Sequence, residues 1–298
     1  MAVAQMKALA SNAKLSSGEH FATVNGIEFQ YFVSGSGPLL VVQAPGWGIG
    51  SEYLRNGLVP LETDFTFVTY DTRGSGHSSR PQNESRMSTS DMVDDLEGLR
   101  AYWGLPTMMV LGHSHGGAIA LGYAIRYPKR VTKLILVDSN IQDFDDRKII
   151  QQQLEARRGD KRFEAAVSWE MAETRSNTDK EFAASVQRGL PLYFYDPDVG
   201  MPLLAKTAPS LPSIWARHTN SAADEKSPIK EDSVMNQVHA KTLILVGEDD
   251  WICPPVIAER IHSAIRGSTI RIFPHCGHFP WIEAAPNFFE QVKLFLRK

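Results

Sequence analysis

The chain has 298 residues, of which 43% are hydrophobic and 22% charged, and its formal net charge is −3. This composition is typical of a globular protein with one large domain, or of one domain that carries an insertion. The charge balance leaves no excess of positive groups to neutralise phosphates, so we do not expect nucleic-acid binding. No segment approaches the roughly 18 continuous apolar residues of a membrane helix, so we expect no membrane insertion.

Two cysteines, Cys253 and Cys276, are too few for a disulfide framework, and we expect both to be buried free thiols. Residues 1–17 are predicted to form a loosely ordered lead-in. They contain no continuous apolar segment followed by a cleavage site, so we predict no secretory signal. These features favour a cytoplasmic protein. They predict neither the oligomeric state nor whether the two thiols meet.

Strands and helices alternate in the first half of the chain. Fully apolar runs indicate strands that are covered on both faces, and this alternation is typical of a parallel sheet with helices on both sides. The predicted elements are a hairpin over 21–33 turning at Asn25-Gly26, strands over 39–42, 65–70, 109–111 and 131–138, and helices over 51–62, 88–103 and 118–127.

The alternation stops after residue 140 and resumes at strands 242–246 and 269–273. Between these points the chain contains amphipathic segments that predict helices, at 148–158, 162–174 and 180–188. A structureless loop of this length is improbable in a compact domain. We therefore predict a doubly wound α/β core, residues 1–140 and 239–298, with a helical insertion over residues 141–238.

Ser114 stands between Gly112 and Gly116, after an apolar strand and before a helical segment. This G-x-S-x-G pattern predicts a strained strand-to-helix turn that exposes the serine hydroxyl. Larger side chains in place of the two glycines would collide within such a turn. The helix that begins behind Ser114 offers free N–H groups to a developing anion.

A serine nucleophile needs a base, and the base needs a partner that fixes its tautomer. Ligands of such sheets bind outside the carboxyl ends of the strands, which directs attention to the loops that follow. The loop after strand 242–246 carries Glu248, Asp249 and Asp250, and the loop after strand 269–273 carries His275 and His278.

The order Ser, Asp, His resembles that of the α/β-hydrolase family. Residues 247–254 are similar to the family's G-x-x-D-x-x-x-P acid loop, and residues 276–283 to its G-H-x-P-x-x-E loop. The resemblance implies an α/β-hydrolase fold whose insertion is a cap, and a catalytic triad of Ser114, Asp250 and His278. It implies no metal and no organic cofactor.

Other assignments stay open at this point. His113 and His115 flank the serine, although neighbours on a tight turn point away from its hydroxyl. His275 is a further candidate base but lacks the preceding glycine. Asp138 ends a predicted inner strand and is an alternative acid.

An oxyanion hole needs two N–H donors directed at the developing charge. The resemblance implies that one is the N–H of His115, directly after the nucleophile. The family's second donor comes from a loop that usually begins His-Gly, where this chain has Pro45-Gly46-Trp47. We therefore predict Trp47 N–H as the second donor. The segment 71–78 matches the D-x-R-G-x-G-x-S motif, and we expect it to support the site through an ion pair and glycine turns.

The pattern most resembles the proline iminopeptidase branch, although that branch's H-G-G-P-G loop and the tryptophan after its nucleophile are both replaced here. Glutamates in the cap of that branch hold the substrate amino group, which implies such a role for Trp169, Glu170 and Glu173. Exposed helix charge is the plainer explanation of these residues. Gly46, Tyr193 and Phe279 are further predicted substrate contacts.

The sequence thus predicts a serine hydrolase that cleaves a small-molecule carboxylic ester, lactone or amide through an acyl-enzyme. The aromatic insertion is expected to enclose an apolar acyl or ring portion of the substrate. A proline iminopeptidase-like aminopeptidase is the narrower alternative. A non-hydrolytic lyase or cyclase, or a ligand receptor, are alternatives because the same fold hosts them.

Overall fold

The computed structural model describes residues 12–172, 175–207 and 210–298. Most of the predicted lead-in, residues 1–11, lies outside the described residues. Within the part described, a short 3-10 helix, η1 (Ala13–Leu15), precedes the first strand. No helix among the described residues is long and apolar enough to cross a bilayer.

Eight strands of the described chain form one sheet in the order β1-β2-β4-β3-β5-β6-β7-β8. β1 and β2 pair antiparallel, as do β2 and β4, and every pair from β3 to β8 is parallel. The predicted mostly parallel, doubly wound sheet is therefore confirmed. The strands are β1 (Gly18–Val24), β2 (Ile27–Gly35), β3 (Leu39–Gln43), β4 (Thr66–Tyr70), β5 (Met108–His113), β6 (Val131–Val137), β7 (Lys241–Gly247) and β8 (Thr269–Phe273).

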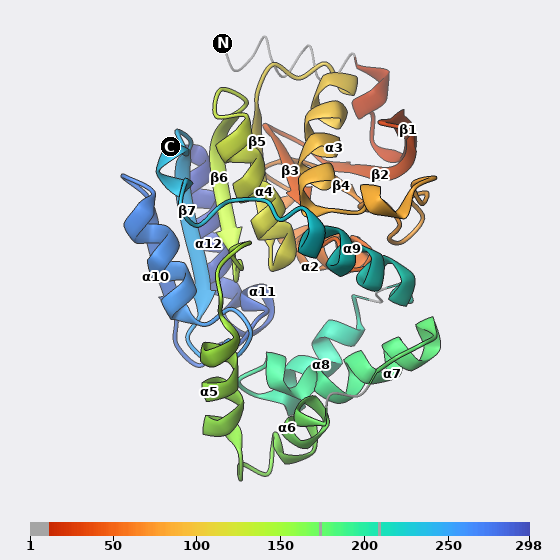
Figure 1. The fold of residues 1–298 in the computed structure, drawn as a ribbon. Helices are drawn as coiled ribbons and strands as arrows, with labels where there is room; N and C mark the ends of the chain where they lie inside the picture. Colours follow the sequence, from red (N-terminus) through yellow and green to blue (C-terminus); the bar gives the residue numbers. More distant parts are fainter. Residues whose placement is uncertain (1–11, 173–174, 208–209) are drawn as a thin grey trace.

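Helices cover both faces of the sheet (Figure 1). One apolar core lies under α3, α4 and α10, and a second lies under α2, α11 and α12. Alternate residues of a strand enter different cores: Val41 of β3 belongs to the first, and Leu40 and Val42 to the second. The core helices are α2 (Glu52–Gly57), α3 (Thr89–Tyr102), α4 (His115–Arg126), α10 (Pro255–Ala264), α11 (Pro280–Glu283) and α12 (Ala285–Arg297).

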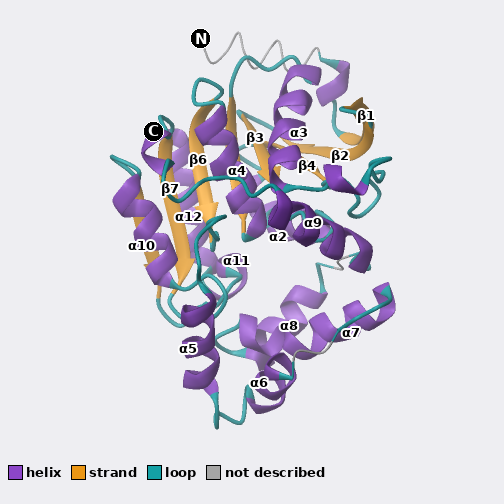
Figure 2. Ribbon diagram, in the orientation of Figure 1, coloured by secondary structure: helices purple, strands orange, loops and turns teal. Residues whose placement is uncertain are grey.

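Among the described residues, five α-helices follow β6 and precede β7, where the sequence predicts the insertion. They are α5 (Arg147–Arg157), α6 (Glu164–Met171), α7 (Asp179–Gly189), α8 (Pro197–Ala205) and α9 (Ile214–Lys226). Figure 2 shows α5 to α8 grouped beyond the ends of β6 and β7 to which the strand arrows point. In contrast, α9 lies against α3 of the core. The insertion thus stands on the side of the sheet where ligands bind in this type of fold.

Two details differ from the expected elements. The predicted helix over 51–62 is divided into α2 and a 3-10 turn, η2 (Val59–Leu61), because Pro60 lies in the first turn of η2 and has no N–H to continue α2. No helices were predicted at α8 and α9, which begin directly after the N-cap residues Asp196 and Ser213.

Candidate active site

Ser114 occupies the turn between β5 and α4 with backbone angles φ 55° and ψ −128°. A positive φ is costly for a serine and persists only where the surrounding structure enforces it. A Cβ on Gly112 would lie 2.3 Å from Gly116 O, and a Cβ on Gly116 would lie 2.3 Å from Gln43 O. Both glycines are therefore required for the close approach of β5, α4 and β3, as the spacing predicts.

Asp250 and His278 form a direct, buried pair. The Asp250 Oδ2 to His278 Nδ1 distance is 2.7 Å, and the two side chains are 0% and 3% exposed. Asp250 Oδ1 accepts hydrogen bonds from the N–H groups of Ile252 (3.0 Å) and Cys253 (3.1 Å). Because a carboxylate only accepts, His278 Nδ1 carries the proton of the neutral ring, and Nε2 is left with its lone pair.

The backbone of His278 is held from two sides. Its N–H donates to Tyr193 O at 2.8 Å, and its carbonyl accepts from His113 Nε2 at 2.9 Å. His113 is the residue before Ser114, so this bond ties the loop after β8 to the turn that carries the serine. The Tyr53 hydroxyl completes the link by donating to His113 Nδ1 at 2.7 Å.

The alternative bases lie in other arrangements. Both ring nitrogens of His113 are occupied, and burial together with the neighbouring His278 keeps its pKa well below the usual value. Neither nitrogen is left to accept a proton from Ser114. His275 is exposed and stacks on Tyr195, with ring centroids 4.8 Å apart.

Asp138, the alternative acid, lies beside Asp250 rather than on the histidine. Its Oδ1 accepts from Gly247 N–H at 2.8 Å, and its Oδ2 is buried without a donor among the described residues. Burial, followed by the charge of Asp250, raises the pKa of Asp138 well above its usual value. The acid that contacts His278 is therefore Asp250.

His115 contributes its side chain as well as its backbone to this region. As the first residue of α4, it has an N–H without an acceptor inside the helix. Its Nδ1 accepts from Gly46 N–H at 3.0 Å, and its ring stacks on that of Trp47, with centroids 5.2 Å apart. Burial lowers the pKa of His115 to about 3, so the ring is neutral. The structure thus brings together Gly46, Trp47 and His115, the residues predicted for the oxyanion hole and its loop.

The segment 71–78 supports the loop after β3. Thr72 Oγ1 donates to Pro45 O at 3.0 Å, directly before Gly46. Arg73 forms a two-point ion pair with Asp95 of α3, at 2.5 and 2.6 Å, and both side chains are 2% exposed. The predicted ion pair of this motif is therefore present, and its partner Asp95 was not identified from the sequence.

The residues predicted to contact substrate in the insertion differ in their surroundings. Trp169 is half-buried and donates through Nε1 to Ser185 Oγ at 3.2 Å. Glu170 is also half-buried, and burial raises its pKa while nearby Arg217 opposes this. Tyr193 packs edge-on against His278, with centroids 5.3 Å apart. Glu173 lies outside the described residues.

Phe279 is 7% exposed and belongs to one of the two apolar cores, where its ring packs on Phe194 at 5.1 Å. It also contacts the rings of His113 and His278. This position supports the histidine from the core side. Direct contact of Phe279 with a substrate stays a prediction.

Asp250, Cys253 and His278 each place one potential metal-ligating atom within 4.8 Å of the other two. The contacts of this cluster already have an explanation, because each Asp250 oxygen is engaged by His278 or by a backbone N–H. Cys253 and Cys276 are both free and buried, as expected.

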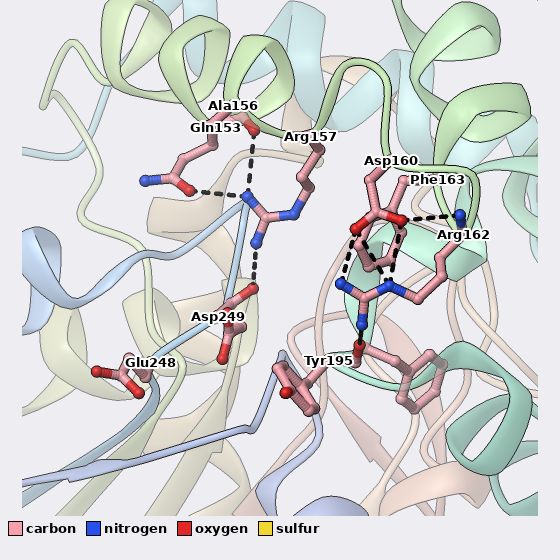
Figure 3. A pocket seen from close by; sticks show the side chains of 10 residues that line it. Gln153, Ala156, Arg157, Asp160, Arg162, Phe163, Tyr195, Glu248 and Asp249 are labelled. Atoms are coloured by element: carbon pink, nitrogen blue, oxygen red, sulfur yellow. Dashed lines mark hydrogen bonds and ion pairs between the residues drawn. The ribbon is translucent and has the colours of Figure 1, made fainter.

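A cavity of about 320 Å³ lies on the outer side of the acid loop, between α5 and Asp249 (Figure 3). Arg157 reaches across it and donates to Asp249 O at 2.5 Å and to Gln153 Oε1 at 2.8 Å. Neither Ser114 nor His278 lines this cavity. The bond from Arg157 to Asp249 O joins the acid loop to α5.

The fold agrees with a family comparison. Residues 39–285 match the model of the alpha/beta hydrolase fold family. This match covers most of the chain, and the protein belongs to that family.

Individual proteins similar to this chain share low sequence identity with it or match only part of it. The chain is 26% identical over 292 residues to the proline iminopeptidase PfmaB of Pestalotiopsis fici, covering 93% of this chain and 99% of that one. Over 103 residues, 34% of this chain and 30% of the relative, it is 41% identical to a (lyso)-N-acylphosphatidylethanolamine lipase of Bos taurus. The enol-lactonase of Burkholderia xenovorans shares the fold with a TM-score of 0.72 at 20% identity, covering 94% of this chain and 100% of that one.

Proposed function

We propose that this protein is a serine hydrolase that cleaves a small-molecule carboxylic ester, lactone or amide through an acyl-enzyme on Ser114. The observation that carries the proposal is the buried Asp250–His278 pair, bonded at 2.7 Å and tied through His113 to the turn of Ser114. The similarity to a proline iminopeptidase supports the proposal, and the enol-lactonase shares the fold.

The proton path follows from the tautomer. His278 Nε2 accepts the proton of the Ser114 hydroxyl as its oxygen attacks the substrate carbonyl, and the imidazolium then donates that proton to the leaving group. Asp250 stabilises the imidazolium through Nδ1–H. Water repeats the sequence on the acyl-enzyme and releases the acid and free Ser114. The proposed reaction requires no metal or organic cofactor.

The N–H groups of His115 and Trp47 hold the oxyanion of the tetrahedral intermediate in the proposed mechanism. The helical insertion over residues 141–238 acts as the cap, with Tyr193 against the reacting histidine. Aromatic side chains at this boundary, Trp47, Phe182 and Tyr193, favour a substrate with an apolar acyl or ring portion.

An aminopeptidase is the second candidate, and Glu170 is the observation that favours it. This half-buried carboxyl lies near Tyr193 and Arg217 and has no hydrogen-bond donor among the described residues. A substrate ammonium group is a suitable partner for it. Faster cleavage of proline amides than of matched N-acetylated amides, with the difference abolished in Glu170→Gln, would favour this candidate over an esterase.

Turnover in oxygen-18 water tests the reaction class. The wild type and Ser114→Ala are incubated with p-nitrophenyl esters, lactones and proline amides, and the acid product is analysed by mass spectrometry. We expect one oxygen-18 atom in the acid released by the wild type and no turnover by Ser114→Ala. A product without the label would identify a non-hydrolytic lyase or cyclase, and ligand binding without turnover would identify a receptor.

A further inference from the structure

A chain of hydrogen bonds connects the loop after β3 to the insertion. Gly46 N–H donates to His115 Nδ1 at 3.0 Å, and His115 Nε2 lies 2.9 Å from Thr89 Oγ1. Thr89 Oγ1 in turn donates to Asp224 Oδ2 at 2.7 Å. The four residues come from the loop after β3, from α4, from α3 and from α9. Motif comparison identifies only the first two.

The donor and the acceptor of each of these hydrogen bonds can be assigned. A backbone N–H only donates, so His115 Nδ1 accepts, and the ring proton is on Nε2. Nε2–H therefore donates to Thr89 Oγ1, and the hydroxyl donates onward to the Asp224 carboxylate. Two further donors, Thr89 N–H at 2.7 Å and Asn220 Nδ2 at 3.0 Å, hold this carboxylate. Burial raises the pKa of Asp224, and these donors oppose that rise.

The chain of hydrogen bonds ends at Gly46, directly before Trp47, whose N–H is the proposed oxyanion donor. The bond from Gly46 N–H to His115 orients the peptide between Pro45 and Gly46, which comes directly before the peptide that carries the Trp47 N–H. The Trp47 ring stacks on the His115 ring, with centroids 5.2 Å apart. The backbone and the side chain of this loop thus both depend on the orientation of one imidazole. His115 is 1% exposed, Thr89 is 0% exposed, and water does not replace their bonds.

We propose that Asp224, acting through Thr89 and His115, is a positioning residue that sets the direction of the Trp47 N–H, so that the seating of α9 controls the oxyanion hole. This inference rests on the proposed hydrolase function. The resemblance to known hydrolases does not supply it, because this chain lacks the usual His-Gly at the loop and carries a histidine after the nucleophile instead. The imidazole that follows Ser114 holds the loop in place.

Thr89→Val and Thr89→Ser form the matched pair for the test. Valine keeps the shape of threonine but leaves His115 Nε2–H without an acceptor, whereas serine retains the hydroxyl. We expect kcat for an activated ester to fall about ten-fold or more in Thr89→Val, with KM little changed, because the oxyanion donor acts in the transition state. Thr89→Ser should stay within about two-fold of the wild type.

A second contact of α9 with the core supplies the structural control. Trp215 Nε1 donates to Glu84 Oε1 at 2.8 Å, outside the hydrogen-bond chain. Glu84→Ala should leave kcat unchanged. Equal kcat values in Thr89→Val and Thr89→Ser would overturn the proposal, as would a loss in Glu84→Ala as large as that in Thr89→Val.

Nitrogen-15 NMR of the free protein tests this chain of hydrogen bonds without any turnover of substrate. We expect the His115 ring to carry its proton on Nε2 in the wild type, and the Trp47 amide resonance to shift in Thr89→Val but not in Thr89→Ser. A proton on Nδ1, or an unmoved Trp47 amide in Thr89→Val, would overturn the inference. Because these signals need no substrate, they separate failure of the inference from failure of the proposed function.

Discussion

The two sides of the site are held in different ways. On the acid–base side, Asp250 and His278 are joined by one direct bond of 2.7 Å between the loops that leave the neighbouring strands β7 and β8. On the oxyanion side, the loop of Gly46 and Trp47 is oriented by the His115 side chain, which depends on α3 and α9.

Short motifs are informative on the acid–base side of the site and much less so on the oxyanion side. Asp250 lies within a motif whose neighbours hold it, since the N–H groups of Ile252 and Cys253 bind its carboxylate. His278 lies within a motif too, although Tyr193 and His113 hold its backbone. The oxyanion side departs from the family pattern and is completed by residues far apart in sequence. Substitutions on the acid–base side should therefore act on chemistry directly, and those on the oxyanion side should act through the positions of loops.

The largest effect is expected for Asp250→Asn. The amide presents a donor where His278 Nδ1–H needs an acceptor, so the ring adopts the wrong tautomer and Nε2 loses its lone pair. We expect kcat to fall by roughly 10³- to 10⁴-fold with the fold retained. Asp249→Asn, at the half-buried neighbouring residue, is the control and should stay within a few-fold of the wild type. A smaller loss in Asp250→Asn than in Asp249→Asn would contradict the assignment.

Arg73→Met tests the support of the oxyanion side. It leaves the Asp95 carboxylate buried without its two-point partner, so we expect the free energy of unfolding to fall by about 3–5 kcal/mol. Urea unfolding measures this change. The double variant Arg73→Met/Asp95→Leu removes the orphaned charge and should recover part of the loss. If the double variant is less stable than Arg73→Met, the pair is not the cause.

Tyr53→Phe tests the link behind His278. It removes the donor to His113 Nδ1 and leaves a buried acceptor unpaired, which should lower the free energy of unfolding by about 1 kcal/mol. We also expect a few-fold lower kcat, because His113 binds the His278 carbonyl. Thermal unfolding and ester hydrolysis give the two values. An unchanged kcat would show that this link contributes to stability alone.

Asp138→Asn tests a contribution to stability that depends on pH. Because the pKa of Asp138 is raised on folding, the folded protein binds more protons than the unfolded chain between the ordinary and the raised value. In that interval the free energy of unfolding falls as pH rises, by up to about 1.4 kcal/mol per pH unit. Asparagine removes this titration and retains an acceptor for Gly247 N–H. The variant should therefore gain stability over the wild type as pH rises, and parallel unfolding curves across pH would contradict this.

Much of the fold could be predicted because its signals are local. Fully apolar runs such as Leu39–Val42 identified the inner strands, and Ser88 with Asp91 forms a capping box that begins α3. The division at Pro60 was missed although its cause, the absent proline N–H, is local. The helices α8 and α9 were missed because short segments in an insertion are fixed by packing rather than by periodicity.

In the candidate site too, residues with a local sequence signal could be predicted and residues held by distant contacts could not. Gly112 and Gly116 are required by collisions within their own turn, and that requirement is visible in the spacing. Thr89 and Asp224 have no motif of their own, and their contact joins positions 135 residues apart. Tyr53 reaches His113 across 60 residues and looks like an ordinary core tyrosine in the sequence. Such partners are identified only once the chain is folded.

The proposed mechanism requires that His278 activates Ser114 as a nucleophile. Intact-protein mass spectrometry after incubation with a fluorophosphonate tests it most directly, with the wild type, Ser114→Ala and His278→Ala compared side by side. We expect a single adduct on the wild type, mapped to Ser114, and none on either variant. A folded wild type that forms no adduct, or an equally fast adduct in His278→Ala, would contradict it.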